Sequence, residues 1–185
     1  EKSMRSLRGQ QISMIFQEPM TSLNPVFTIG NQMREVLRTH QPMSKAQATA
    51  ACCLMLESVR LPDPYHVLER YPHELSGGML QRVMIALALA CNPALLLADE
   101  PTTALDVTVQ GQILAILAEL AMAQNLAVIF VTHDMGVVAQ LCHRVAVMYA
   151  GQLVEEAPVH TLFDFPAHPY TQGLIASIPG QIPGK

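Results

Sequence analysis

Residues 95–106 read LLLADEPTTALD, an apolar run that ends in acids. A continuous apolar run of this length is typical of a parallel strand that is buried on both faces. The run leads into Asp99 and Glu100, then a proline turn, and then a second aspartate, Asp106. On these residues alone two interpretations stay open. The acids either face a metal-bound phosphate, or they belong to a strand end followed by a solvated turn.

The segments around this stretch alternate between strand and helix patterns after residue 75, which favours a parallel α/β sheet. The block 28–74 has almost no strand signal, so we expect a helical subdomain inserted into the α/β core. The expected strands are 11–17, 95–99, 127–132 (also buried) and 145–149, with a hairpin return after Gly151. The expected helices are 28–60 (two helices, the second capped by Ser44), 79–91, 104–123, 135–142 and 170–177, with loops at 18–25 and 61–66.

Composition narrows the class of protein. Half of the 185 residues are hydrophobic, so one domain, or one large and one small, can bury a substantial core. The net charge is −4 with 11 Lys and Arg, which spread thinly and form no basic stripe for nucleic acid. No two cysteines form a C-x-x-C pair, and we expect reduced core thiols and no zinc site. The four are Cys52, Cys53, Cys91 and Cys142.

No apolar run reaches the roughly 18 residues that span a bilayer. The first ten residues, EKSMRSLRGQ, are charged and lead into no signal core. The chain starts at Glu1 without an initiator Met, so we expect either processing or a piece of a longer protein. A membrane partner can still hold it at a membrane surface.

Four features carry candidate chemistry. Gln17 ends the first strand, where an amide can ligate Mg²⁺ or orient water. The stretch LSGGM (75–79) opens a helix, and its glycines leave backbone N–H groups open to a phosphate. Asp99 suits a magnesium ligand and Glu100 a base for water. His133 follows the second buried strand, at the sheet edge where open α/β sheets bind ligands. Each feature alone is also compatible with a purely structural residue.

In their order and spacing, these motifs resemble the ATP-binding subunit of ABC transporters, over nearly the whole chain. Gln17 matches the Q-loop, LSGGM the signature, LLLADE the Walker B strand, Asp106 the D-loop and His133 the H-loop. QEPMTSLNP, DEPTTALDVT, THDMGVV and the tail's HPYTQGL (168–174) resemble the branch that imports dipeptides, oligopeptides, glutathione and nickel. The resemblance implies an α/β, P-loop NTPase-type (RecA-like) parallel sheet core with an inserted α-helical subdomain.

The resemblance also implies roles. Glu100 is the catalytic base and His133 steadies the terminal phosphate. Asp99 and Gln17 hold Mg²⁺, and Gln17's loop senses the membrane domain. The nucleotide-binding set is Gln17, Ser76, Gly77, Gly78, Met79 and Asp106. Position 79 is Met where the wider family usually has Gln, as it often is in the peptide branch. The implied ligands are ATP and Mg²⁺.

The implied partners are a second ATP-binding domain, identical or not, integral membrane permease subunits and, indirectly, a solute-binding protein. The implied location is the cytoplasmic face of the plasma (inner) membrane. Four parts follow: residues 1–27 as core strand and Q-loop, 28–80 as the helical subdomain ending in the signature, 81–157 as the RecA-like core, and 158–185 as a C-terminal extension of the peptide-importer type.

The sequence lacks a P-loop, G-x-x-x-x-G-K-[ST], whose lysine reaches the terminal phosphates. None of its lysines (Lys2, Lys45 and Lys185) lies in such a motif. The family places the P-loop upstream of the Q-loop, so the sheet is expected to be incomplete, with an apolar core face unprotected. We expect the isolated chain to bind ATP poorly and to hydrolyse it negligibly.

Three hypotheses remain. The first is the energy-coupling ATPase of a small-peptide importer, here without its P-loop part. The second is a non-catalytic remnant or partner-docking fragment of such an ATPase. The third, an ABC-type ATPase acting on nucleic acid, needs a basic path or long coiled coils, and the sequence has neither. The cargo is not readable from this chain.

Overall fold

The structure is a computed structural model that describes residue 4, residues 7–103 and residues 105–178. Contacts divide the chain into two compact units, residues 1–131 and 132–185, which are described separately. The four-part division expected from the sequence stays a prediction. None of the helices in the described residues is both long and apolar enough to cross a membrane.

The first unit is built on a parallel sheet, as the sequence predicts. Strands β1 (Ile12–Ile15), β2 (Leu95–Asp99) and β3 (Ala127–Val131) follow the order β1-β2-β3, so β2 is central. Ile15 pairs with Ala98, and Asp99 pairs with Val131. Because all three strands run the same way, their carboxyl ends share one edge of the sheet. Gln17 and Glu100 follow two of these ends.

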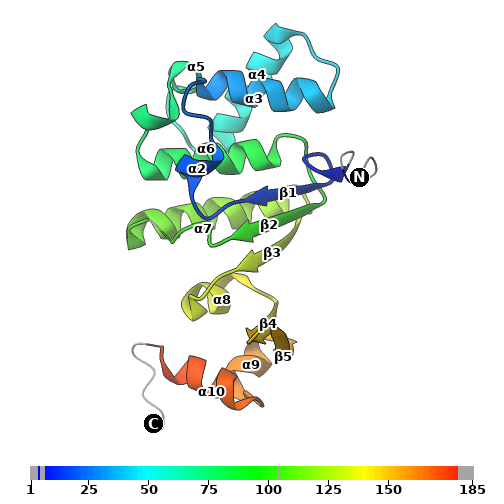
Figure 1. The fold of residues 1–185 in the computed structure, drawn as a ribbon, viewed down its shortest axis with the longest axis vertical. Coiled ribbons are helices and arrows are strands. Elements are labelled where there is room, and N and C mark those ends of the chain that lie inside the picture. Colours follow the sequence, from blue (N-terminus) through cyan, green and yellow to red (C-terminus); the bar gives the residue numbers. More distant parts are fainter. Residues whose placement is uncertain (1–3, 5–6, 104, 179–185) are drawn as a thin grey trace. The chain divides into compact units, whose positions relative to one another are not determined.

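Helices cover this sheet and form a group of their own. In Figure 1, α3, α4 and α5 gather beyond α6, on the side of α6 away from the sheet. Buried side chains of α3, α4 and α6 join those of the sheet in one apolar core cluster. The helices of this unit are α2 (Pro19–Ser22), α3 (Ile29–His40), α4 (Lys45–Ser58), α5 (Pro64–Glu69), the 3₁₀ turn η1 (Pro72–Glu74), α6 (Gly77–Leu89) and α7 (Val107–Ala123).

Side-chain caps fix where the main helices begin. Ser44 and Gln47 form a reciprocal capping box at α4, which confirms Ser44 as its N-cap. Thr28, Ser76 and Asp106 cap α3, α6 and α7 in the same way, each through a side-chain oxygen that accepts a backbone N–H. The expected loops at 18–25 and 61–66 also contain the short helices α2 and α5. Asp63 before Pro64 is the signal for α5, because Pro is favoured at the first helical position.

The two apolar strands β2 and β3 differ in burial. Leu96 and Ala98 of β2 are fully buried, whereas Ile129 and Val131 of β3 are each 53% exposed. The prediction that 127–132 is a buried strand is therefore right about the strand and wrong about its burial. β3 lies at the edge of the described sheet, so it has a neighbour on one side only.

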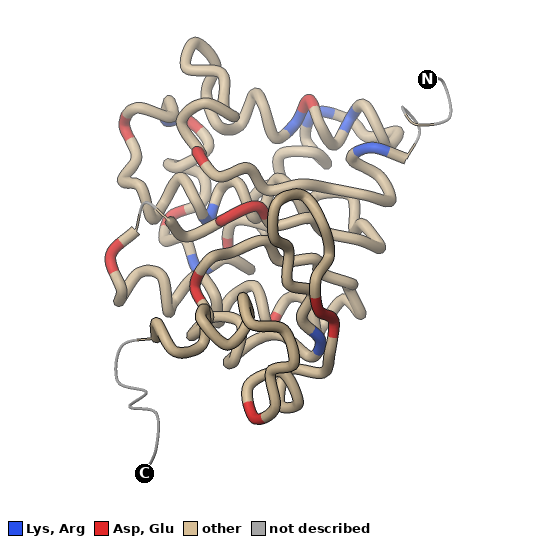
Figure 2. The backbone as a smooth tube through the Cα atoms, turned by 60° about the horizontal axis from the view of Figure 1, so that its bottom comes forward, with Lys and Arg blue, Asp and Glu red and all other residues tan. Residues whose placement is uncertain are grey.

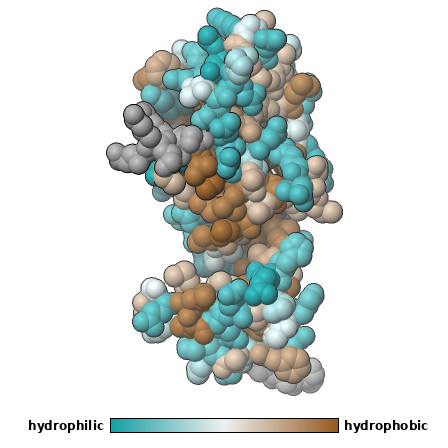
Figure 3. Space-filling model, turned by 90° about the vertical axis from the view of Figure 1, so that its right-hand side faces the viewer, coloured by the Kyte–Doolittle hydropathy of each residue, from teal (hydrophilic) through white to brown (hydrophobic). Residues whose placement is uncertain are grey.

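An apolar surface results over the sheet of the first unit, brown in Figure 3. Its exposed side chains come from β1, the residue after it, and β3: Met14, Phe16, Ile129 and Val131. The expectation of an unprotected apolar face agrees with this exposure.

The second unit contains α8 (Met135–Leu141), the strands β4 (Arg144–Tyr149) and β5 (Gln152–Pro158), and the helices α9 (Val159–Asp164) and α10 (Pro169–Ala176). β4 was expected as a third core strand with a hairpin return after Gly151. It pairs antiparallel with β5 across that turn, which confirms the hairpin. In the described residues the two strands form a separate two-stranded sheet, so β4 does not extend the parallel sheet. The turn between them is tight, with Ala150 and Gly151 both at positive φ.

Candidate active site

Three side chains meet at the carboxyl edge of the parallel sheet. The Gln17 Nε2 amide donates to Glu100 Oε2 at 2.7 Å, and the Thr103 hydroxyl donates to the same oxygen at 2.9 Å. Gln17 lies two residues after β1, and Glu100 directly follows β2. The parallel pairing of these strands brings the two positions together. A bond to a charged acceptor is among the stronger hydrogen bonds, so Gln17 and Thr103 hold the carboxylate in one orientation.

The backbone at Glu100 is unusual. Its φ is +43°, in the left-handed region that a residue with a side chain rarely adopts. The Glu100 N–H donates to the carbonyl of Val131 at 2.9 Å, which ties the residue to β3. Such conformations cost energy and persist where the surroundings enforce them, often at functional sites. The turn out of β2 is thus shaped to present this carboxylate.

Asp99 and Gln17 supply oxygens that fit Mg²⁺. Asp99 is half-buried at the end of β2, and its carboxylate makes no hydrogen bond or ion pair with the described residues. Because the Gln17 amide nitrogen faces Glu100, its oxygen is the atom left to accept or ligate. No cluster of three or more His, Cys, Asp or Glu suited to a metal occurs in the described ranges. Mg²⁺ keeps several waters and takes few protein ligands, so two oxygens such as these are chemically suited to it.

The predicted signature forms the first turn of α6. Ser76 is exposed and caps the helix, its Oγ accepting from the Met79 N–H at 3.4 Å. Gly77 is exposed and Gly78 is half-buried. Met79 packs against the apolar core. The exposed start of a helix offers backbone N–H groups and a positive dipole end to an anion. The nucleotide-binding roles of these residues stay predictions.

The signature turn touches the turn that carries Asp106. A Cβ added to Gly78 would lie 2.9 Å from Cγ1 of Val109, whereas one added to Gly77 would lie 3.7 Å from Leu105 Cδ2. The Asp106 carboxylate accepts the Val109 N–H at 3.0 Å and so caps α7. Gly78 is therefore needed for close packing of α6 on α7. The sequence suggested only that this glycine lets a phosphate approach.

His133 lies in the second unit, two residues after β3 ends, and its side chain is exposed. Asp134 follows as the N-cap of α8, its Oδ1 accepting the Gly136 N–H at 2.8 Å. The Asp134 N–H in turn donates to the Thr132 hydroxyl. These local bonds define the loop that carries His133. Its role toward a phosphate remains a prediction.

Two residues of the site escaped the sequence analysis. Thr103 was quoted within DEPTTALD, but its bond to Glu100 was not foreseen; a hydroxyl three residues after an acid in a proline turn is the available signal. Val109 lies within the helix 104–123 that the sequence predicts. Its contact with Gly78 depends on how two helices pack, and no local pattern gives that.

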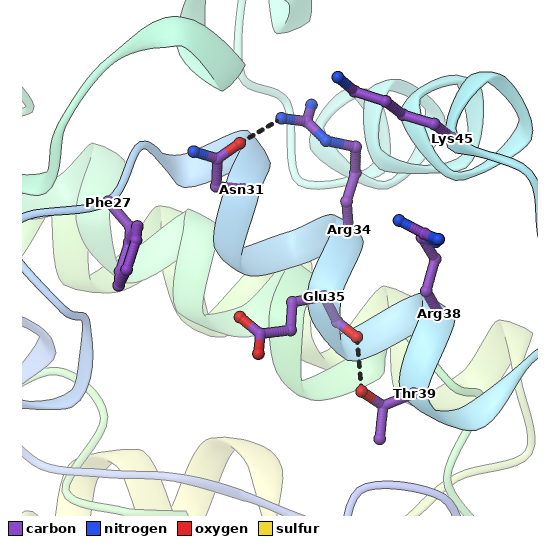
Figure 4. A pocket seen from close by; sticks show the side chains of 7 residues that line it. All are labelled: Phe27, Asn31, Arg34, Glu35, Arg38, Thr39 and Lys45. Carbon is purple, nitrogen blue, oxygen red and sulfur yellow. Dashed lines mark hydrogen bonds between the residues drawn. The ribbon is translucent and has the colours of Figure 1, made fainter.

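A hollow of about 480 Å³ opens elsewhere in the first unit, along α3. Figure 4 shows Phe27 toward one end, with Arg34, Arg38 and Lys45 toward the other and Glu35 between them. None of the predicted site residues lines it. Arg34 donates to Asn31 Oδ1 at 2.7 Å. In the described residues no carboxylate pairs with these three cations, whereas Arg60, Arg70 and Arg144 form ion pairs.

Comparison with known families defines the class. Residues 1–103 match the family model "ABC transporter", so the chain belongs to the ABC transporter family. Residues 154–185 match the model "Oligopeptide/dipeptide transporter, C-terminal region". With this second match, the chain falls among the ATP-binding domains of the oligopeptide and glutathione importer branch.

Curated relatives agree. The chain is 58% identical over 179 residues to the "Glutathione import ATP-binding protein GsiA" of Pectobacterium atrosepticum, covering 97% of this chain and 29% of that protein. It is 55% identical over its whole length to the "Probable peptide ABC transporter ATP-binding protein y4tR" of Sinorhizobium fredii, of which it covers 55%. The chain thus spans about a third to a half of the length of these relatives.

Solved structures support the fold. A dimeric post-hydrolysis state of the ATP-binding cassette MJ0796, bound to ADP and Pi, superposes with a TM-score of 0.76 at 29% identity. The match covers 86% of this chain and 67% of that one. A second dimeric MJ0796 structure gives 0.75 at 30% identity. The α/β fold of an ABC ATPase is therefore confirmed.

Proposed function

We propose that this chain is part of an ATP-hydrolysing subunit that energises an importer of small peptides or related solutes. The observation that carries the proposal is the cluster of Gln17, Glu100 and Thr103, in a chain of the ABC family. Hydrolysis needs a base aimed at a water beside a phosphate, and Glu100 is held in one orientation by two donors at the edge where such sheets bind ligands.

The other residues have complementary roles in this proposal. Asp99 and the Gln17 amide oxygen hold Mg²⁺, which neutralises charge on the phosphates when bound. Ser76, Gly77 and Gly78 present backbone N–H groups and a helix dipole to the terminal phosphate held by a second domain. His133 steadies a terminal phosphate, and Asp106 shapes the loop at the domain interface. Met79 supports the signature turn from the core side.

The partners are a second ATP-binding domain and the permease subunits, with a solute-binding protein acting through them. Both MJ0796 structures are dimeric, which supports the first. The segment after Gln17 supports the second, because it exposes Met20, Val26 and Phe27 and joins the site directly to the hollow along α3. We therefore propose that the subunit acts at the cytoplasmic face of the inner membrane.

The proposal is tested in the chain joined to its upstream coding sequence. We expect Mg-ATP hydrolysis to fall by roughly 10²–10⁴-fold in Glu100→Gln, the factor that a positioned base contributes. The matched control is Glu119→Gln, which removes an exposed carboxylate of α7 and leaves the rate unchanged. Equal rates in wild type and Glu100→Gln would contradict the proposal.

Sequencing the coding DNA upstream of Glu1 distinguishes the ATPase proposal from the non-catalytic alternative. The ATPase proposal requires an in-frame G-x-x-x-x-G-K-[ST] after a strand-like run. A stop codon or unrelated sequence there would favour the remnant, whose acids have no complete site to serve. The nucleic-acid hypothesis is not supported: Figure 2 shows the basic residues of the described chain as separate short segments, and the tail matches a transporter model.

A further inference from the structure

Arg82, on α6, joins three helices. Its Nη1 donates to the carbonyls of Val59 at 3.0 Å and Arg60 at 3.3 Å, at the carboxyl end of α4. Its Nη2 donates to Gln112 Oε1 of α7 at 2.9 Å. The side chain is half-buried. One guanidinium therefore binds the end of one helix and the side of another.

These acceptors explain why an arginine suits the position. The last carbonyls of a helix lack partners within the helix and carry a partial negative charge. The Val59 carbonyl belongs to a residue that is fully buried, so little water replaces a lost donor. Only the planar fork of arginine reaches two carbonyls and an amide at once, whereas lysine offers a single charged point.

Arg82 lies just beyond the signature turn of the same helix. That turn already packs on α7 through Gly78 and Val109, and Val109 is bound by Asp106. The Arg82–Gln112 bond makes a second link between α6 and α7, further along both helices. Two separated links fix both the distance between the helices and their relative rotation.

We propose that Arg82 is a positioning residue: it locks α6 to α7 so that the Ser76–Gly78 turn and the Asp106 turn form one rigid body. In the proposed ATPase both turns face the partner domain, so the effect of Arg82 on ATP binding rests on the proposed function. The coupling between the two helices is independent of that function. Residues far from the phosphate thereby set how the signature meets it.

The coupling is tested in the nucleotide-free chain by amide hydrogen exchange. The reporters are the Leu80 N–H, bound to the Ser76 carbonyl, and the Val109 N–H, bound to Asp106. In Arg82→Ala we expect both to exchange about tenfold faster, an opening free energy lower by about 1.4 kcal/mol. Arg82→Lys should fall between this variant and wild type.

A matched control removes another arginine that also joins α4 to α7. Arg60 pairs with Glu119 at 2.7 Å on the surface, and Arg60→Ala should leave both reporters unchanged. The milder Gln112→Ala removes an exposed acceptor and keeps the cap on α4, so folding is retained; it should speed the Val109 amide. Reporter rates unchanged in Arg82→Ala and Gln112→Ala, or raised only as much as the β2 amides that report global unfolding, would overturn the proposal.

Kinetics of the protein that carries the upstream sequence give a second readout. Arg82→Ala should raise KM for ATP about tenfold with a smaller change in kcat, because the signature contacts bound nucleotide before and during the reaction. A lower melting temperature with KM unchanged would reduce Arg82 to a structural residue. Hydrolysis that survives Glu100→Gln would overturn the proposed function, while the exchange rates still decide the coupling.

Discussion

Strands β2 and β3 are neighbours of similar composition, LLLAD and AVIFV, yet their environments are opposite. β2 has a strand on each side and its Leu96 is fully buried. β3 has one strand neighbour, and four of its five residues are more than a third exposed. An apolar run therefore indicates that a strand can be buried. Whether the strand is buried depends on which strands and helices pack against it.

The largest expected effect is on stability within this pair. Leu96→Ala should cost about 2–5 kcal/mol of unfolding free energy, because it leaves a cavity in a closed core. Ile129→Ala should cost roughly 0.5 kcal/mol, since its side chain is half exposed. Urea unfolding of the two variants measures the difference. Equal costs would show that β3 is buried in solution and would break the comparison.

A second contrast lies at the start of α6, where the neighbouring residues Gly77 and Gly78 differ in how closely they approach α7. Gly78→Ala drives a Cβ to 2.9 Å from the stiff side chain of Val109 and should cost about 1–3 kcal/mol. Gly77→Ala meets only an ordinary contact and should stay within roughly 1 kcal/mol of wild type. Thermal unfolding of both variants tests this. A Gly77 variant as unstable as the Gly78 variant would show that the contact with Val109 does not set the cost.

The open strand should also make the chain associate with itself. A charge on an exposed edge strand discourages pairing, so Ile129→Lys should lower the fraction of oligomer in sedimentation. Leu54→Lys is the control, because Leu54 is exposed on α4, away from the sheet. If both lysines reduce association equally, net charge rather than the β3 surface is responsible.

The smallest expected effect is a pH-dependent local opening in the second unit, at Glu155, which leaves the strands of the first unit unchanged. Glu155 accepts the N–H groups of Ala167 at 2.8 Å and His168 at 3.0 Å. The Thr171 side chain and these two backbone N–H groups lower the pKa of Glu155 below its usual 4.5. A depressed pKa stabilises the folded unit above the ordinary value, and the contribution is lost as pH falls through the folded pKa.

Amide exchange at Ala167 should therefore rise below pH 4.5 faster than the intrinsic rate predicts, while β2 amides stay protected. Glu155→Gln should remove the pH dependence. A loss of β2 protection over the same range would point to global unfolding instead.

The fold was largely readable from the sequence. The helices within 28–60 and 104–123, the cap Ser44 and the strand LLLAD are local patterns, and local patterns persist in the structure. The parallel sheet was also expected, but the bond between Gln17 and Glu100 was found only in the structure. The burial of β3 and the contacts of Arg82 did not follow, because each depends on neighbours that are distant in the sequence. The Thr103 bond to Glu100 spans only three residues, but a turn sequence does not show which hydroxyl faces which carboxylate.

The most direct test of the account is Mg-ATP turnover by the 185-residue chain alone, measured beside its Glu100→Gln variant. We propose that Glu100 is a base in a site whose phosphate-binding loop is not in this sequence. Because that site is incomplete in the 185-residue chain, we expect turnover no higher in the wild-type chain than in the variant. Robust turnover that disappears in Glu100→Gln would contradict it, because the chain would then contain a complete site.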